Sequence, residues 1–348
     1  EICACLVGSE MCIRDRLQVK PIADNFGKTA ESGVQKFIRS FQIVTLKDEQ
    51  YFLDEKIPET LPGLVSPPQP NDSYSDYLNI LRNTDKEKSE LKLKHLRMEQ
   101  LFSTPYCMKM SQEFKGKFFI SPSNLLNKKQ SKYMPHLKAT SFDGQSVDLE
   151  DSLKGKISVV LFQPNVDVSK KWGETWFKNI QDDKNFLTNP ESFQDFNNTL
   201  KDDLDTLSYK DIIGKYRTSN SRFSSGINSG SSVPFKKNKN FKLLKSQIIQ
   251  INSINSTAQR FMNYVMEGKL KKNIPEEYKE NFFTVDLEKQ LPFYLKYNLN
   301  LFNPFPPVIL LVDENLKIRW TCSGVAQNEN EAKFLWNLVN DLRLKELS

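Results

Sequence analysis

Cysteine is the residue of this 348-residue chain best suited to nucleophilic or redox chemistry, and it occurs only five times. Cys107 and Cys322 lie in the body of the chain, and the first 16 residues hold Cys3, Cys5 and Cys12. A reactive thiol needs a lowered pKa, which a helix N-terminus, a nearby cation or a C-x-x-C pair provides. Neither Cys107 nor Cys322 belongs to such a pair. Because Cys322 follows an expected outer strand, we interpret it as a small packed residue.

Histidine, a common general base and metal ligand, occurs twice, at His95 and His136. His95 lies on an expected helical stripe, which is typical of a packed side chain. Ser169 has no histidine near it in the sequence to serve as its base. The C-x-x-C and H-E-x-x-H metal spacings are absent, as are the Walker A and G-x-G-x-x-G phosphate loops. We therefore expect no catalytic residue, no metal site and no cofactor.

The first 16 residues (EICACLVGSEMCIRDR) resemble the translation of a sequencing adapter, so we leave residues 1–16 out of the structural reasoning. Without their two arginines and three acidic residues, the net charge rises from +6 to +7. The longest apolar runs, at 157–162 and 308–312, are far shorter than the roughly 20 residues that a membrane-spanning helix needs. Any attachment to a membrane is therefore expected to be peripheral.

Residues 17–130 are expected to form an extended, helix-containing N-terminal region. Proline lacks the amide donor and fixes φ, so a proline-rich segment at 57–72 predicts an extended connector. Its prolines are Pro58, Pro62, Pro67, Pro68 and Pro70. A helical pattern follows from about Asp85, and Pro105 ends it. Its apolar stripe comprises Leu91, His95, Met98 and Phe102.

Residues 131–348 alternate strand and helix patterns. The continuous apolar runs predict buried, neighbouring central strands, and alternation after the turn at 313–315 predicts a hairpin. The expected strands lie at 157–162, 247–252, 308–312 and 316–321, with an earlier turn at Asp143-Gly144. The expected helices carry stripes at Trp172, Trp176 and Ile180, and at Phe334, Leu335, Leu338 and Leu342. This order predicts an α/β, thioredoxin-like C-terminal domain.

An insertion at about 201–245 interrupts this domain. Its Ser/Asn/Gly-rich stretch at 219–232 cannot bury enough apolar area to offset the entropy of ordering, so we expect disorder. A run of lysines follows, which we interpret as solvated loop charge. Its members are Lys236, Lys237, Lys239, Lys242 and Lys245.

The loop after the first central strand is where a thioredoxin-like oxidoreductase keeps its reactive thiol, at the N-terminus of a helix. Here the loop at 163–172 reads QPNVDVSKKW and contains no cysteine. Pro307 stands just before the next central strand, where thioredoxin-like proteins often carry a cis proline. The chain is therefore expected to have the fold of such an enzyme without its nucleophilic cysteine.

Several segments between about residues 94 and 342 resemble the mitochondrial ATP synthase assembly factors of the yeast "factor ten" type. They are STPY at 103–106, KGKFFISP at 115–122, YMPHL at 133–137, FDG at 142–144, LKGKISV at 153–159, LVD at 311–313, KIRW at 317–320 and SG at 323–324. Two features depart from the family pattern. FPP at 305–307 stands before the strand at 308–312, where the family has a Gly-Tyr type of sequence. The insertion at about 201–245 is longer than the family pattern leads us to expect.

This resemblance implies a redox-dead, thioredoxin-like protein at the matrix side of the mitochondrial inner membrane. The family assists assembly of the membrane-embedded proton-channel subunit (subunit a) with the rotor ring. We accordingly expect a non-enzymatic chaperone, held peripherally on the inner-membrane surface, whose partners are subunit a and the rotor ring. Basic residues near an anionic leaflet favour such attachment.

The hairpin is the expected partner-binding segment, because it matches the family and mixes polar with aromatic residues. Its candidate residues are Arg319, Trp320, Ser323 and Gly324. Trp320 is in phase with Ile318, which favours a place in the core. Arg319 points to the other face of the strand and is expected to be exposed.

Two alternative functions remain open from the residues alone. One is a peroxiredoxin-like thiol oxidoreductase that uses Cys107 or Cys322. The other is a basic RNA-binding protein, suggested by the positive net charge. The aromatic residues follow core stripes and no RNP-type motif occurs, so no nucleic-acid partner is expected.

Overall fold

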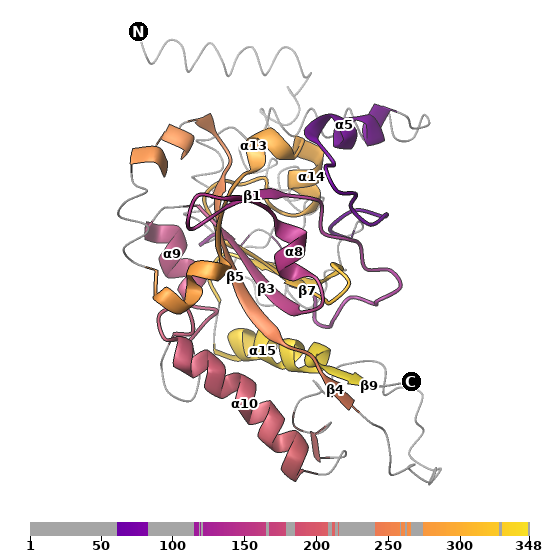
Figure 1. The fold of residues 1–348 in the computed structure, drawn as a ribbon, viewed down its shortest axis with the longest axis vertical. Helices are drawn as coiled ribbons and strands as arrows, with labels where there is room; N and C mark the ends of the chain where they lie inside the picture. Colours follow the sequence, from indigo (N-terminus) through magenta and orange to yellow (C-terminus); the bar gives the residue numbers. More distant parts are fainter. Residues whose placement is uncertain are drawn as a thin grey trace, which may run out of the picture.

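One mixed sheet forms the centre of the protein (Figure 1). The computed structural model describes residues 61–82, 115–117, 119, 121–164, 167–178, 185–207, 211–212, 215, 241–257, 259–261, 263–265, 274–326 and 329–346. Within these residues, seven strands pair in the order β2-β1-β6-β5-β3-β7-β8, and β4 pairs with β9 in a second, two-stranded sheet.

The central strand is β3 (Ile157–Gln163), whose first six residues are all buried. β5 (Ser246–Ile254) runs parallel to it on one side, and β7 (Val308–Val312) runs antiparallel on the other. Continuous apolar runs suit strands that are covered on both faces. The prediction that the runs at 157–162 and 308–312 are neighbouring strands is confirmed.

The sheet extends beyond β5 through β6 (Phe282–Asp286), which is parallel to β5 and follows the 3-10 helix η2 (Glu276–Asn281). The hairpin of β1 (Lys138–Ser141) and β2 (Ser146–Asp148) completes that side. It turns at Asp143-Gly144, as predicted, and Gly144 has the positive φ of 86° that the turn requires.

The opposite edge is β8 (Ile318–Ser323), which pairs with β7 as the predicted hairpin. It begins two residues later than the prediction, because Leu316 has a left-handed backbone (φ 65°) and belongs to the turn. The peptide bond before Pro307 is trans. Parallel β3 and β5, followed by an antiparallel hairpin and a C-terminal helix, give the thioredoxin-like arrangement.

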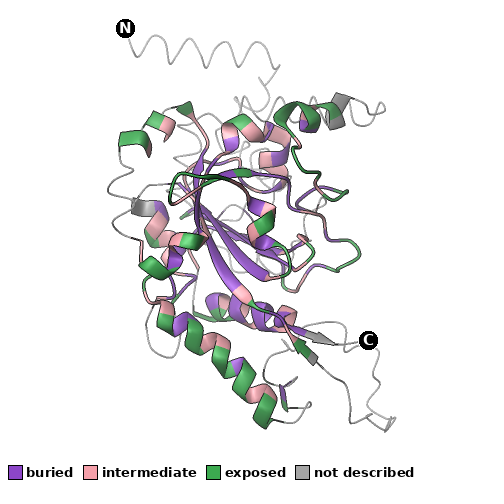
Figure 2. Ribbon diagram, viewed as in Figure 1, coloured by how far each residue is buried: buried purple, intermediate pink, exposed green. Residues whose placement is uncertain are grey.

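Helices cover both faces of the sheet (Figure 2). One face carries α9 (Asp167–Glu174), α10 (Pro190–Thr206) and α15 (Glu329–Arg343). The aromatic residues packed there include Trp176, Phe177, Phe186, Phe193, Trp320 and Trp336. The other face carries α5 (Tyr74–Arg82), α8 (Leu149–Leu153), α13 (Leu287–Gln290) and α14 (Phe293–Asn298).

The helix expected through Trp172, Trp176 and Ile180 is shorter than predicted. α9 ends at Glu174, and Trp176 lies in the turn that follows, where its amide donates to the Gly173 carbonyl at 3.0 Å. Trp176 is fully buried, as its place on the stripe predicts. Ile180 lies outside the described residues.

Part of the expected N-terminal extension belongs to the main packing unit. Leu64 exchanges backbone hydrogen bonds of 2.8 Å with Tyr133, and Tyr77 of α5 is buried in the core. Phe119 and Leu126 are buried as well. The boundary expected at residue 131 therefore does not separate two packing units. The helix expected from about Asp85 to Phe102 lies outside the described residues.

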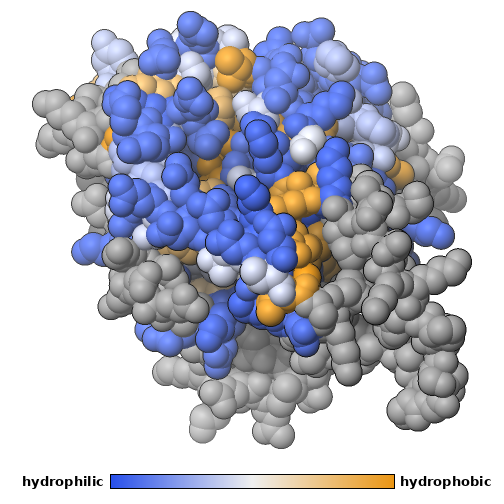
Figure 3. Space-filling view, turned by 60° about the horizontal axis from the view of Figure 1, so that its bottom comes forward, coloured by the Kyte–Doolittle hydropathy of each residue, from blue (hydrophilic) through white to orange (hydrophobic). Residues whose placement is uncertain are grey.

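The expected insertion at 201–245 is ordered at both ends, which corrects its boundaries. α10 continues to Thr206, because Leu200 packs against Ile212 and Leu344. At the other end, β4 (Phe241–Leu243) pairs with β9 (Leu344–Glu346). The stretch at 219–232 lies outside the described residues. Figure 3 turns the lower end of the molecule forward; the coloured part of this face is mainly hydrophilic, with apolar side chains gathered near its centre and smaller apolar areas elsewhere.

Candidate functional site

The four residues expected to bind a partner lie together along β8 and just beyond its end. Trp320 is 0% and Ser323 1% exposed, and Gly324 is buried. The Arg319 side chain is only 11% exposed, so the expectation that it faces solvent is wrong. A partner can reach these side chains only if the segments that cover them move away.

Arg319 is held between a buried carboxylate and a backbone carbonyl. Its Nη1 lies 3.3 Å from Oδ2 of Asp313, which is 0% exposed, and its Nε donates to the Leu126 carbonyl at 2.9 Å. The Leu126 amide donates back to the Arg319 carbonyl at 2.8 Å. Arg319 thus ties the segment around Leu126 to β8.

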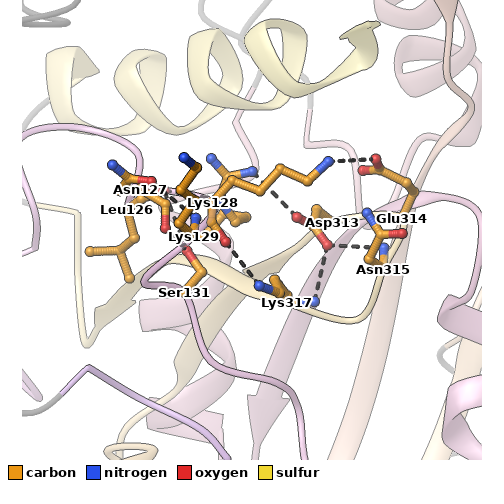
Figure 4. A network of polar contacts seen from close by, with 10 residues as sticks. Leu126, Asn127, Lys128, Lys129, Ser131, Asp313, Glu314, Asn315 and Lys317 are labelled. Carbon is orange, nitrogen blue, oxygen red and sulfur yellow. Dashed lines mark hydrogen bonds and ion pairs between the residues drawn. The ribbon is translucent and has the colours of Figure 1, made fainter. Parts of the chain in front are cut away.

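The same carboxylate shapes the turn between β7 and β8. Asp313 Oδ1 accepts from the amides of Asn315 and Lys317, at 2.9 and 3.0 Å. Lys317 Nζ donates to the Lys128 carbonyl at 2.9 Å, and Lys128 Nζ lies 3.3 Å from Glu314 Oε1 (Figure 4). The turn and the segment around Lys128 therefore form one polar network, which fixes this segment against the β7–β8 hairpin.

A close crossing of two glycines covers the end of the hairpin. A Cβ atom on Gly324 would lie 2.3 Å from the Gly116 carbonyl carbon and 2.5 Å from the Lys117 amide nitrogen. Gly324 also has a φ of 67°, which favours glycine. Both glycines belong to segments that carry the family resemblance, KGKFFISP and SG, and the structure brings these distant segments into contact.

Lys117, next to Gly116 in the sequence, is buried beneath the crossing of the two glycines. Its side chain is fully buried, forms an ion pair with Glu331 of α15, and lies 4.9 Å from the ring centroid of Trp176. Trp176 Nε1 in turn donates to the Gly324 carbonyl at 2.7 Å. A buried ammonium needs such compensation, so the ion pair and the ring fix Lys117 in a structural position.

Cys322 lies beside this group and does not resemble a catalytic thiol. It is 0% exposed, and burial raises the pKa of its thiol well above the usual range. The Lys117 ammonium lowers that pKa and the Glu331 carboxylate raises it, but burial has the largest effect. The thiol is therefore protonated at neutral pH, and the thiolate is the nucleophile. Cys107 lies outside the described residues.

The loop after β3 offers no alternative nucleophile among its described residues. Ser169 of α9 is 1% exposed, and its Oγ has no hydrogen-bond partner. His136 is engaged elsewhere, with Nδ1 2.7 Å from Glu150 Oε1. No group of acidic, histidine or cysteine side chains in the described parts of the chain has the arrangement of a metal site.

Sequence reasoning missed an exposed apolar surface just beyond β5. Phe261, Tyr264 and Val265 are 67%, 80% and 58% exposed. Their spacing of i, i+3 and i+4 places them on one face of a helix. The signal that was available is the polar side chains of Gln259, Arg260 and Asn263 on the same segment, which pack against the protein instead.

The fold and its covered hairpin define a thioredoxin-like protein whose expected thiol position lacks a cysteine. The chain belongs to the ATP10 family: the family described as ATP10 protein matches residues 54–203 and 222–342, well over half of its length. The resemblance read from the sequence motifs is thereby confirmed.

Three relatives bear the name mitochondrial ATPase complex subunit ATP10. The one from Saccharomyces cerevisiae is 23% identical over 90% of this chain and 95% of its own. The one from Candida glabrata is 25% identical over 80% and 82%, and the one from Eremothecium gossypii 22% identical over 81% and 83%.

Among solved structures, the chain is similar to a DsbF homologue from Corynebacterium diphtheriae, with 10% identity and a TM-score of 0.28 over 61% of this chain and 89% of that one. It is also similar to BsSco, a member of the Sco family of cytochrome c oxidase assembly proteins. That match has 13% identity and a TM-score of 0.28 over 62% of this chain and 98% of that one. None of the helices in the described ranges has the length and apolar character needed to cross a membrane.

Proposed function

We propose that this protein is a non-enzymatic assembly chaperone for the mitochondrial ATP synthase. Its client is the membrane-embedded proton-channel subunit (subunit a), which it helps to join with the rotor ring. The observation that carries the proposal is the ATP10 family match, which spans all seven strands of the main sheet. Three relatives named mitochondrial ATPase complex subunit support the same role.

The structure supports a binding role in preference to redox chemistry. In the position where a thioredoxin-like enzyme exposes its thiol, this chain has Gln163-Pro164 and a helix without cysteine. Cys322 is fully buried. A stable sheet with a covered hairpin is suited to present a fixed surface to a client, and such binding requires no covalent step.

We place the protein at the matrix side of the inner membrane, attached peripherally. A chaperone for an apolar membrane subunit must stay close to the bilayer while the subunit is inserted. The positive net charge of the chain favours an anionic leaflet. The exposed apolar side chains beyond β5 provide an additional means of contact.

Complementation with a cysteine-free chain tests both the role and its chemistry. Yeast cells that lack their own ATP10 protein are given either the wild-type chain or a variant with Cys107→Ser and Cys322→Ser. In both chains a mitochondrial presequence replaces residues 1–16, so the two differ only at the cysteines. We expect both chains to restore assembled ATP synthase to within about twofold, because Cys322 is buried and the expected thiol position holds no cysteine.

Two results would contradict the proposal separately. If the wild-type chain is imported and folded but ATP synthase stays unassembled, the assembly role is wrong. If the wild-type chain restores assembly and a folded cysteine-free chain does not, the protein works through a thiol. Native gel electrophoresis measures assembly, and a melting curve of each purified chain reports folding, since a buried serine hydroxyl without a partner carries a stability cost.

A further inference from the structure

The helical segment within residues 257–265 packs with its polar side against the protein. Its first turn is fixed by Ser256, whose Oγ accepts from the Gln259 amide at 3.2 Å, while Gln259 Oε1 accepts from the Asn255 amide at 2.7 Å. Gln259 Nε2 also donates to the Pro304 carbonyl at 2.9 Å. The Ser256 side chain thus caps the start of the helix, and Gln259 ties its first turn to the chain before the cap and to Pro304.

Two further polar residues anchor the same side. Arg260 donates to both carboxylate oxygens of Asp286, at 2.8 and 3.2 Å, and to Glu288 at 3.0 Å. Asn252 of β5 is hydrogen-bonded to the Asn263 side chain. A bidentate arginine–carboxylate pair gives a defined orientation. The helix is thus fixed to the sheet through its polar residues.

The apolar residues consequently point away from the protein. Phe261, Tyr264 and Val265 are all more than half exposed, whereas Gln259, Arg260 and Asn263 are partly buried. Figure 2 shows these short helical pieces as largely exposed, beyond the end of β5 at the upper left. An ordinary surface helix has the opposite orientation, with its apolar side toward the core. We call Phe261, Tyr264 and Val265 the apolar helix face.

We propose that the apolar helix face docks on the surface of a bilayer that contains anionic lipids. Aromatic and aliphatic side chains on one helix face enter the interfacial region, and positive charge on the protein attracts anionic headgroups. The net charge of the chain is +6, and Lys269, Lys271 and Lys272 follow this segment in the sequence. The carboxylates of Asp286 and Glu288 are paired with Arg260, which reduces their repulsion of an anionic surface.

The size and position of the face favour a lipid surface over a protein partner. A stable protein interface buries about 800 Å² on each partner, with a closely packed centre. Three side chains on a projecting helix supply only a small part of that area. Shallow insertion into a bilayer requires only a few such side chains when electrostatic attraction is added.

This inference deepens the proposed function by naming the surface that holds the chaperone at the membrane, and it rests on the proposed peripheral attachment. Its test needs only the purified full chain and vesicles, so its failure leaves the complementation result unaffected. Vesicles of phosphatidylcholine alone are compared with an equimolar mixture of phosphatidylcholine and phosphatidylglycerol. Co-sedimentation measures binding to each.

We expect the wild-type chain to bind the anionic vesicles more strongly than the neutral ones. The double variant Phe261→Ser/Tyr264→Ser is expected to lose at least about tenfold in affinity for the anionic vesicles, because two apolar side chains are removed from the interface. Val65→Ser/Leu207→Ser is the matched control, since it removes two exposed apolar side chains elsewhere, 81% and 37% exposed. Its binding is expected to equal that of the wild type.

Val265→Asp provides a second test that places a negative charge on the same face. Melting curves show which variants are folded, and exposed positions usually change stability by no more than about 0.5 kcal/mol. The inference is overturned if the wild-type chain binds neither vesicle, or if both folded variants of the apolar helix face bind as strongly as the wild type. If a folded variant of the apolar helix face binds vesicles as strongly as the wild type but no longer co-precipitates subunit a, the face belongs to a protein partner and the inference is overturned as well.

Discussion

Replacing Gly324 by alanine is expected to lower the free energy of unfolding by about 3–5 kcal/mol. The new Cβ would lie 2.3 Å from the Gly116 carbonyl carbon, so two backbone segments must separate to admit it. The φ of 67° at Gly324 adds the cost of a left-handed alanine. Urea unfolding, followed by tryptophan fluorescence, measures the change.

Gly144→Ala is the matched control for this prediction. Gly144 also has a positive φ, 86°, but a Cβ there would meet nothing within 4 Å. We expect it to cost only about 1–2 kcal/mol, the price of the backbone conformation alone. Equal losses for the two variants would show that the Gly116–Gly324 crossing does not contribute to stability.

Arg319→Glu is expected to lower the free energy of unfolding by about 3 kcal/mol or more. The change removes the cation that pairs with the fully buried Asp313 and places a second carboxylate beside it. It also removes the hydrogen bond to the Leu126 carbonyl. Urea unfolding measures this loss directly.

Lys333→Glu reverses the same charge at an exposed position of α15 and serves as the control. Surface substitutions of this kind usually stay within about 0.5 kcal/mol. If Arg319→Glu unfolds at the same urea concentration as Lys333→Glu, the Asp313 network does not stabilise the hairpin. Any loss of partner binding by Arg319→Glu must therefore be compared with its loss of folded protein.

The central strands could be predicted because their signal is local. The runs at 157–162 and 308–312 are apolar at every position, which is typical of strands covered on both faces. Trp320 is buried, as predicted, but the predicted reason was wrong: a register shift between Leu311 and Val312 places Trp320 in the core on the opposite face of the sheet from Ile318. Periodicity was sufficient for the central strands, because their signal depends on neighbouring residues alone.

The burial of Arg319 could not be predicted in the same way. Its burial depends on the Leu126 carbonyl, which accepts from Arg319 Nε and lies 193 positions earlier in the chain. The Gly116–Gly324 crossing also joins segments that are far apart in the sequence. Contacts between remote segments leave no periodic signal, although both glycines lie in the motifs that carried the resemblance.

Two segments show where composition and spacing were insufficient. The insertion was expected to begin near Lys201 because the sequence becomes polar, yet α10 continues to Thr206, and Leu200 and Leu204, four residues apart, pack beside Leu344. The apolar spacing of Phe261, Tyr264 and Val265 is that of one helix face. Spacing identifies a face but not its direction, which here is set by polar anchors such as Arg260.

Capture of newly made subunit a tests the central claim most directly. In mitochondria that contain a tagged chain, subunit a is pulse-labelled and the chain is precipitated after increasing chase times. The account predicts that labelled subunit a co-precipitates early and is released as it joins the rotor ring, with the cysteine-free chain behaving like the wild type. If labelled subunit a never co-precipitates with a folded chain, or does so only when the cysteines are present, the account is contradicted.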